Sequence, residues 1–153
     1  MTRVDGRPGL MGDQEIAERV GEFVYSNDVA ARMAGIKLIA IAPGSAITQM
    51  EVIGDMANAH GICHGGMIFM LADCAFAYAA NSTNRASVAA SSSIEFMQAG
   101  KLGGVLTAQA AERANSARNT FIEVLVTDNL GNQIALYHGR AHRLKSEQVI
   151  PVD

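Results

Sequence analysis

The feature that most constrains the fold is an apolar run of 13 residues, Ile68 to Ala80, which a single carboxylate interrupts at Asp73. The surrounding segment, Met67 to Asn81, is rich in Ala, Leu and Met and contains no Gly or Pro, which predicts an α-helix. A membrane span needs roughly 20 apolar residues, so this run belongs inside a folded domain. Because the helix is apolar on nearly every face, other structure has to surround it.

The size and composition of the chain bound its class. Its 153 residues fit one domain, and 49% hydrophobic residues exclude an intrinsically disordered chain. A net charge of -3 and the absence of Trp argue against nucleic acid as a partner. Two cysteines are too few for a disulfide scaffold, and the N-terminus lacks the apolar core of a secretory signal. We therefore expect a cytoplasmic protein with no membrane partner.

The pattern on either side of the central helix predicts an α+β domain. Residues 1–12 are expected to form a flexible lead-in, 13–145 a single domain and 146–153 a loose C-terminal tail. A helix capped by Asp13 and a short helical turn ending at Gly35 come first. Alternating apolar residues and turn-forming residues predict strands at 36–42, 46–53, 88–96, 105–112, 120–127 and 133–143. One antiparallel sheet then has to curl around the central helix.

The residues best suited to chemistry lie at the start of the central helix, in the segment Asn58 to Gly66. Gly65 and Gly66 allow a ligand to approach the backbone, where the first N–H groups of a helix have no partner inside the helix. The helix dipole there favours an oxygen that gains negative charge. By itself, a Gly-Gly pair is better explained as a tight turn into the helix. Asp73 favours chemistry, because a lone carboxylate among apolar residues is costly to bury unless it is paired or functional.

The spacing of these groups implies a second subunit. Gly65 and Asp73 are eight residues apart, which separates them by about 12 Å along one helix. A base and an oxyanion donor that serve one carbon atom must lie much closer than that. If they act together, Gly65 comes from one subunit and Asp73 from the other. The sequence therefore predicts two shared active sites in a two-fold homodimer.

Two other kinds of site use residues of the same loop. His60, Cys63 and His64 crowd together, but their spacing matches no common zinc pattern, so we expect no metal. Cys63 beside a histidine is also compatible with a thiol nucleophile. The carboxylate and the helix start form the more coherent arrangement.

Four motifs carry a resemblance to a known family: Asn58, His64-Gly65-Gly66, Leu71-Ala72-Asp73 and Ser91 to Phe96. Together they resemble the hotdog-fold acyl-CoA thioesterases, and among these the phenylacetic-acid-degradation type. The resemblance covers roughly residues 30–143. It implies a hotdog fold, in which a curled antiparallel sheet wraps around a long central helix, and dimers that pair into homotetramers. It also implies hydrolysis of an acyl-CoA such as phenylacetyl-CoA, with no cofactor besides the coenzyme A of the substrate.

The resemblance also implies roles for single residues. The Gly65 amide polarises the thioester carbonyl, and Asp73 either activates water or attacks the carbonyl directly. Asn58 orients the thioester, and His64 supports the loop. Ser91 is expected to orient the water or the carboxylate, although simple alternation places it opposite Val88 and Ile94 unless a bulge intervenes.

The remaining candidates concern substrate binding and other functions. We expect Gly66 to contact the substrate, together with Arg118, Asn119 and Thr120 in the connection between two late strands. The basic residues available for the phosphates of coenzyme A are Arg113, Arg118, Arg140, Arg143 and Lys145. The alternatives are a non-catalytic module that binds acyl-CoA and a hotdog dehydratase. Asp73 argues against mere binding, which has no need for a carboxylate beside a thioester.

Overall fold

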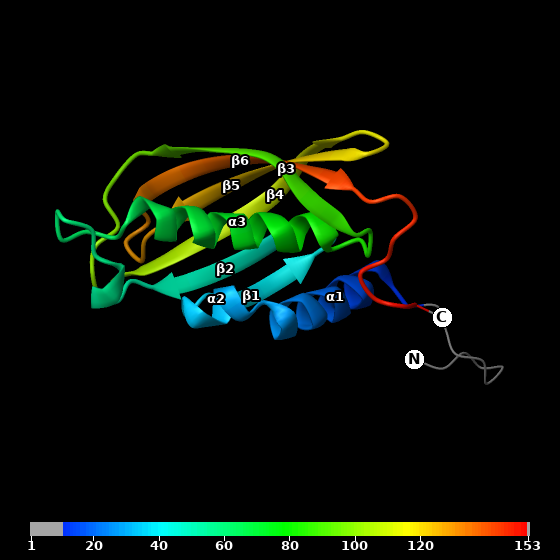
Figure 1. Cartoon of the computed structure of the whole chain (residues 1–153), viewed down its shortest axis with the longest axis horizontal. Coiled ribbons are helices and arrows are strands. Elements are labelled where there is room, and N and C mark those ends of the chain that lie inside the picture. Colours follow the sequence, from blue (N-terminus) through cyan, green and yellow to red (C-terminus); the bar gives the residue numbers. More distant parts are fainter. Residues whose placement is uncertain (1–10, 153) are drawn as a thin grey trace.

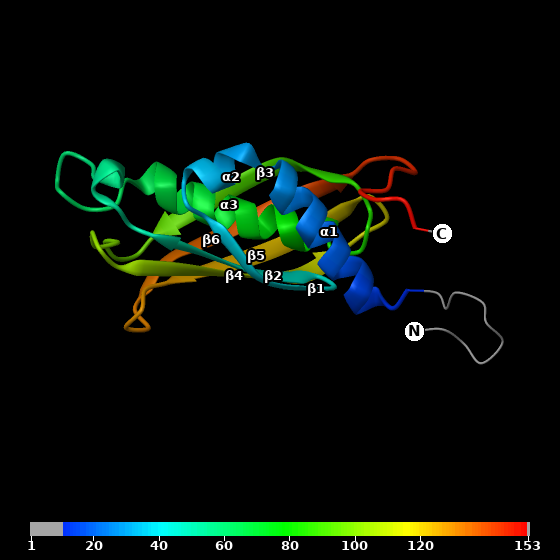
Figure 2. The same ribbon diagram turned by 90° about the horizontal axis from the view of Figure 1, so that it is seen from below.

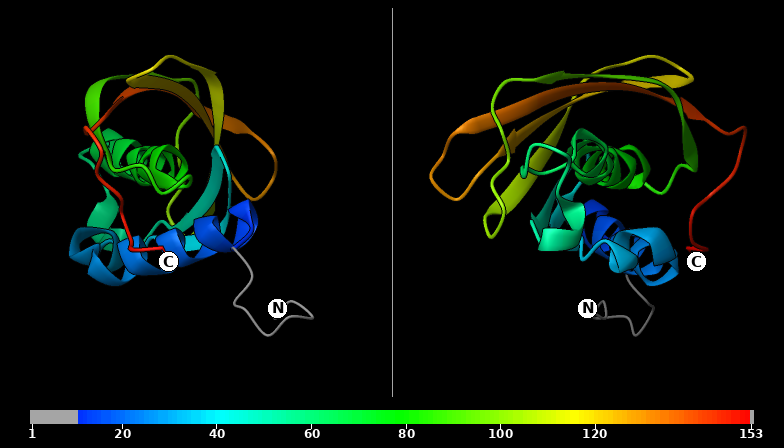
Figure 3. Two further views of the ribbon diagram at one scale, coloured as in Figure 1. Left: turned by 90° about the vertical axis from the view of Figure 1, so that its right-hand side faces the viewer. Right: turned by 60° about the vertical axis from the view of Figure 1, so that its left-hand side comes forward.

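The computed structural model describes residues 11–152, so most of the expected lead-in lies outside the described residues. Within that range, six antiparallel strands form one sheet in the order β1-β2-β4-β5-β6-β3, curled around a long helix (Figures 1 and 3). The elements in chain order are α1 (Asp13–Asn27), α2 (Val29–Met33), β1 (Lys37–Ala42), β2 (Ser45–Glu51), the 3-10 turn η1 (Gly54–Met56), α3 (Gly65–Asn81), β3 (Ser87–Phe96), β4 (Val105–Asn115), β5 (Asn119–Thr127) and β6 (Gln133–Arg143). The predicted α+β class is confirmed.

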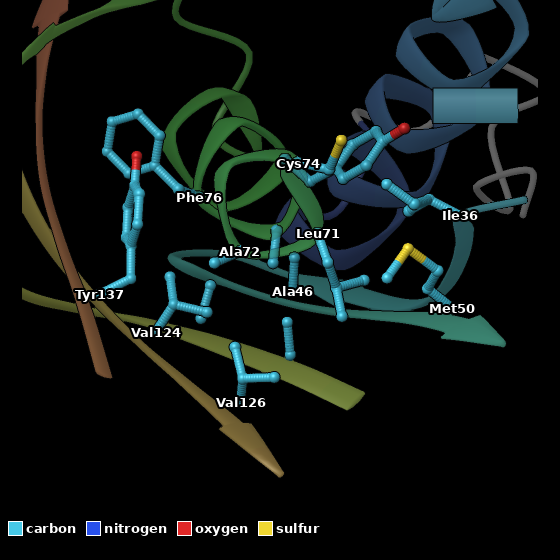
Figure 4. Close-up of a cluster of buried hydrophobic side chains, with 14 of the residues drawn as sticks. Ile36, Ala46, Met50, Leu71, Ala72, Cys74, Phe76, Val124, Val126 and Tyr137 are labelled. Atoms are coloured by element: carbon cyan, nitrogen blue, oxygen red, sulfur yellow. The ribbon is translucent and has the colours of Figure 1, made fainter. Parts of the chain in front are cut away.

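The central helix α3 packs most of its surface against the rest of the chain. Figure 4 shows Leu71 and Ala72 directed toward side chains of the sheet, among them Val124 and Val126. One stripe of the helix nevertheless stays at least partly exposed, and we call it the open stripe: Gly66, Met70, Asp73 and Ala77. Their spacing of three and four residues places them on one helix face. Outside this stripe, Gly65, Met67, Phe69 and Asn81 are also partly exposed, and the rest of the helix is enclosed as expected.

The first two helices lie across α3 and the β1 edge of the sheet (Figure 2). Helix α1 approaches β1 closely at Gly21, where an added Cβ would lie 2.9 Å from a methyl group of Leu38. The prediction that Asp13 caps this helix was wrong: Gly12 is the N-cap, and Asp13 is the first helical residue. Asp28 instead caps α2, because its carboxylate accepts a hydrogen bond from the Ala31 N–H.

Strand β3 lies at the edge of the sheet. It pairs with β6, and among the described residues nothing pairs with its other edge. The side chains of Val88 and Phe96 are 50% and 54% exposed. A bulge shifts the register of β3 between Ala89 and Ser91. The chain thus leaves both a long strand edge and the open stripe of α3 uncovered.

The expectation that the C-terminal tail is loose was wrong. The Asn84 side chain accepts hydrogen bonds from the N–H groups of Val149 and Ile150 and donates one to the Ile150 carbonyl at 2.9 Å. Asn84 is buried and has a φ of 60°, a left-handed conformation that Asn tolerates better than most residues. Hydrogen bonds therefore hold the tail against the loop that follows α3, and the local sequence of the tail does not predict them.

Candidate active site

Asp73 lies at the middle of α3 on the open stripe and is partly exposed. Its Oδ1 accepts a hydrogen bond of 2.7 Å from the hydroxyl of Tyr137, which β6 places beneath the helix. The Ser92 hydroxyl, on the edge strand β3, lies 2.7 Å from the same tyrosine oxygen. The carboxylate is therefore held by an uncharged donor while one side of it still faces outward, an arrangement suited to a reactive group.

The start of α3 is built around His64. This residue is the N-cap, and its Nδ1 accepts a hydrogen bond from the Gly66 N–H at 2.9 Å. Its own N–H donates to the Met56 carbonyl, which anchors the loop before the helix. The expectation that His64 supports this loop agrees with these contacts. The Gly66 N–H is occupied by this cap, so it is not free for a substrate.

Gly65 is the residue at the helix start whose N–H remains available. No hydrogen bond from this N–H is found within residues 11–152. A Cβ at Gly65 would lie 3.1 Å from the ring of Phe96, so glycine lets the aromatic side chain of β3 pack directly on the helix start. An unpaired N–H at a helix N-terminus is a suitable donor to a developing oxyanion.

Asn58 closes the loop that leads to the helix. Its Oδ1 accepts hydrogen bonds from the N–H groups of His60 and Ile62, at 2.9 and 3.3 Å. Among the described residues its side-chain amide donates to no acceptor. The carbonyl end of Asn58 therefore has a structural role, and the amide end is left for another partner.

Gly65 and Asp73 do not meet within one chain. Both belong to α3, with Gly65 as its first residue and Asp73 eight residues later. The rise of an α-helix over this interval is about 12 Å. The geometric premise of the predicted shared site therefore holds in the folded chain.

The bulge in β3 decides which serine approaches Asp73. By register Ser91 lies opposite Arg140, whereas Ser92 lies opposite Gly139 and reaches Tyr137. Both serines line a hollow of about 360 Å³ with Arg113, Glu123, His138 and Arg140, among others. The described geometry therefore links Ser92 to the carboxylate and gives Ser91 no such contact.

The segment expected to bind coenzyme A lies at the other end of the molecule from Gly65, where α3 ends (Figure 1). Arg118 lines a cleft of about 550 Å³ there, whose other basic residues are Arg85, Arg143 and Lys145. Asn119 accepts a hydrogen bond from Arg140, and Thr120 is buried with no partner for its hydroxyl among the described residues. Of the three expected contacts, Arg118 alone faces this cleft.

The comparisons with known proteins agree with this geometry. Residues 60–135 match the family model described as the Thioesterase superfamily. The acyl-coenzyme A thioesterase PaaI of Escherichia coli (strain K12) is 38% identical over 121 residues, which cover 79% of this chain and 86% of that protein. This chain belongs to the thioesterase superfamily. The resemblance of its motifs to thioesterases is thereby confirmed.

Solved structures of related proteins confirm the hotdog fold. The structure of E. coli PaaI, from the phenylacetic acid degradation operon, superimposes with a TM-score of 0.85 at 35% identity, over 87% of this chain and 96% of that one. A Streptococcus mutans protein bound to acetyl CoA gives a TM-score of 0.70 at 26% identity, over 74% and 91% of the two chains. The curled sheet around α3 thus has the same fold as E. coli PaaI.

The other kinds of site considered for this thioesterase receive little support. Burial raises the pKa of the Cys63 thiol and, helped by the charges of Asp28 and Asp73, raises that of Cys74 to about 12. Because the thiolate is the nucleophile, both cysteines are poorly suited to attack a thioester at neutral pH. Across residues 11–152, no three His, Cys, Asp or Glu side chains gather closely enough to hold a metal ion. No helix in the described part is long and apolar enough to cross a membrane.

Sequence reasoning missed Tyr137 and Ser92. Alternation along β6 predicts that Tyr137 faces the core, and the structure agrees, since the side chain is fully buried. Nothing in the local pattern indicates that its hydroxyl meets a carboxylate 64 residues away. Ser92 was hidden among three consecutive serines, because the bulge that turns it inward arises from pairing with β6.

Proposed function

We propose that this chain hydrolyses an acyl-CoA thioester, phenylacetyl-CoA or a related aryl-acyl-CoA, to the free acid and coenzyme A. The observation that carries the proposal is the Asp73 carboxylate, held by Tyr137 and partly exposed on an otherwise apolar helix. Relatives support the substrate class: E. coli PaaI is named an acyl-coenzyme A thioesterase, and the Streptococcus mutans structure contains acetyl CoA. The aryl-acyl group is supported by the operon of the E. coli protein.

Two routes to the same products fit these residues. In the first, Asp73 takes a proton from water, the water oxygen adds to the thioester carbon, the C–S bond breaks, and the sulfur leaves with the proton. In the second, the carboxylate itself adds to the carbon, the C–S bond breaks, and coenzyme A leaves as a thiolate that takes a proton from water. Water then hydrolyses the resulting anhydride, which releases the free acid and restores the Asp73 carboxylate. In both routes the carbonyl oxygen becomes negative, and the Gly65 N–H is the donor that stabilises it.

The proposed site is shared between two subunits. The uncovered edge of β3 and the open stripe of α3 are the surfaces that a second copy would cover by pairing edge to edge. In that arrangement, Gly65 of the partner subunit approaches Asp73, which removes the separation of about 12 Å along one helix. The Asn58 amide and the aromatic ring of Phe96 accompany Gly65 into the same interface. From the resemblance, we also propose that two such dimers pair into a homotetramer.

Coenzyme A would extend from Asp73 toward the basic cleft at the end of α3. Arg85, Arg118, Arg143 and Lys145 gather there in a chain whose net charge is -3. Phosphate groups favour such a cluster, and arginine binds them with paired hydrogen bonds. Among the expected binding residues, we propose Arg118 as the direct phosphate contact. Asn119, which accepts a hydrogen bond from Arg140, and Thr120 shape the strand behind it.

The proposal is tested by measuring thiol release from phenylacetyl-CoA, hydroxylated aryl-acyl-CoAs and straight-chain acyl-CoAs, with wild type and Asp73→Asn. We expect Asp73→Asn to keep the fold and to lower kcat by roughly 10²–10⁴-fold, the usual scale for a lost general base. The fastest substrate identifies the acyl group. A variant with wild-type turnover would remove Asp73 from the mechanism. Tight acyl-CoA binding without thiol release by wild type would favour the binding-module alternative.

A further inference from the structure

Tyr137 is held rigidly beneath the carboxylate of Asp73. Its side chain is fully buried. Its ring packs edge-on against Phe69, with ring centres 5.3 Å apart, and in a tilted arrangement against Phe76, with ring centres 5.7 Å apart. Figure 4 shows the ring of Tyr137 lying beside that of Phe76. Close packing around an enclosed aromatic ring removes the rotational freedom of the side chain. The hydroxyl therefore has a fixed position relative to α3.

The direction of the hydrogen bonds follows from the donors available. Burial is the main reason that the pKa of Tyr137 is raised, so the phenol keeps its proton in the neutral pH range. A carboxylate only accepts hydrogen bonds, so Tyr137 donates to Asp73 Oδ1. Its oxygen is then free to accept, and the Ser92 hydroxyl at 2.7 Å is the donor. The result is a series of two hydrogen bonds that runs from the donor Ser92 through Tyr137 to the acceptor Asp73.

This series of hydrogen bonds engages Oδ1 of Asp73 and leaves Oδ2 without a partner among the described residues. Within residues 11–152, no hydrogen bond reaches Asp73 Oδ2. The other members of the open stripe, Gly66, Met70 and Ala77, carry no side-chain donor that could replace Tyr137. Without Tyr137 the carboxylate would rotate more freely.

We propose that Tyr137 is a positioning residue for the thioesterase reaction: it holds Oδ1 of Asp73 so that Oδ2 faces the substrate, with Ser92 as its supporting donor. This inference rests on the proposed function, since it assigns a role to a neighbour of the proposed catalytic carboxylate. Tyr137 itself does not touch the substrate. It acts by fixing the orientation of Asp73.

The test replaces Tyr137 by Phe, which keeps the ring and removes the hydroxyl. We expect kcat to fall by about 10- to 100-fold, the scale of one hydrogen bond to a charged group, with KM nearly unchanged. Ser92→Ala should also lower kcat, by less, with KM nearly unchanged.

Tyr78→Phe provides the matched control. Tyr78 is also buried in the core, and its hydroxyl has no hydrogen-bond partner among the described residues. Its removal should leave kcat and KM unchanged. In the Asp73→Asn background, Tyr137→Phe should have little further effect on residual turnover, because Tyr137 acts through that carboxylate.

Each outcome separates this inference from the proposed function. Wild-type kcat in a folded Tyr137→Phe protein would overturn the positioning role and leave the thioesterase proposal standing. An equal loss in both the wild-type and the Asp73→Asn backgrounds would overturn the coupling through Asp73. If the wild-type protein releases no thiol from any acyl-CoA, the proposed function fails, and the positioning role fails with it.

Discussion

At the scale of single residues, the site depends on which backbone and side-chain groups are left without a partner. His64 occupies the N–H of Gly66, so the N–H of Gly65 is the one left at the helix start. Likewise, Tyr137 engages one oxygen of Asp73 and leaves the other. In both cases the neighbours of the reactive group select the atom that is available for chemistry. The Gly-Gly pair and Asp73, considered without these neighbours, do not determine which N–H and which carboxylate oxygen stay available.

Substitution of Gly65 separates the role of its N–H from that of its small size. Gly65 is the first residue of α3, a position that accepts proline well. Gly65→Ala keeps the N–H and adds a Cβ 3.1 Å from Phe96, whereas Gly65→Pro also removes the N–H. We expect kcat of Gly65→Pro to be about 10²–10³-fold below that of Gly65→Ala, the scale of one oxyanion donor. Steady-state kinetics of the two variants measure this ratio, and equal kcat values would exclude the N–H from the reaction.

At the scale of elements, the packing of α3 into the curled sheet depends on a glycine in β6. A Cβ at Gly139 would lie 2.5 Å from the ring of Phe76, which no ordinary packing tolerates. Tyr137 and Gly139 both face the helix, so the large residue supplies the hydroxyl for Asp73 and the small one makes room for Phe76. The helix therefore sits at a depth in the sheet that brings Asp73 to Tyr137.

We expect Gly139→Ala to destabilise the protein by about 1–3 kcal/mol, because the added methyl group overpacks the core. Urea-induced unfolding gives the change in the free energy of unfolding. Gly54→Ala is the matched control, since nothing lies within 4 Å of a Cβ added there, and it should change stability by less than about 0.5 kcal/mol. If the two variants are equally stable, the close contact with Phe76 does not limit the packing of α3.

At the scale of the whole molecule, two uncovered surfaces lie next to the site. The open stripe of α3 carries Asp73, and the edge strand β3 carries Ser92 and Phe96. A strand edge without a partner is a surface that natural proteins cover or protect. Pairing of two copies through β3 would cover it and complete the proposed site in one step. Assembly and catalysis are therefore expected to depend on the same interface.

Subunit mixing tests this dependence. Neither Asp73→Asn nor Gly65→Pro homodimers contain an intact shared site, but a heterodimer of the two contains one. Random mixing in equal amounts should restore about a quarter of the wild-type activity, because about half of the dimers are mixed and each has one of two sites. Thiol release after co-expression or co-refolding measures the recovery. No recovery, despite subunit exchange shown by mass spectrometry of the native dimers, would contradict the shared site.

The stability of the fold should decrease in alkaline solution. The pKa of Cys74 rises from 9.0 to about 12 on folding, chiefly through burial. Burial also raises the pKa values of Tyr78 and Tyr137. Because the folded state keeps protons that the unfolded state loses, the contribution of Cys74 is complete below pH 9 and is lost as the pH rises toward 12, by at most about 1.4 kcal/mol per pH unit. Urea unfolding of wild type and Cys74→Ala between pH 7 and 11 should show a shallower decline in the variant, and parallel curves would contradict this.

Local sequence patterns were enough to predict the elements and the main catalytic candidates. The strand at 133–143 was predicted with the bounds that the structure shows, because a turn and regular alternation mark it on both sides. The central helix followed from its composition, and the carboxylate within it identified Asp73 as the residue to examine. These features depend on residues close together in the chain, where propensity and periodicity act directly.

Tertiary structure decided what links distant segments. The hydrogen bond between Tyr137 and Asp73 joins residues 64 positions apart. The hydrogen bond between Asn84 and Ile150 of the tail joins residues 66 positions apart. The bulge in β3, which turns Ser92 toward Tyr137, exists because of the pairing with β6. Helix depth, strand register and tail docking are set by how side chains fill the space between elements, and no local pattern encodes that fit. The sequence by itself therefore determined the fold class and identified Asp73 as the carboxylate to test, and packing decided which neighbours hold that carboxylate.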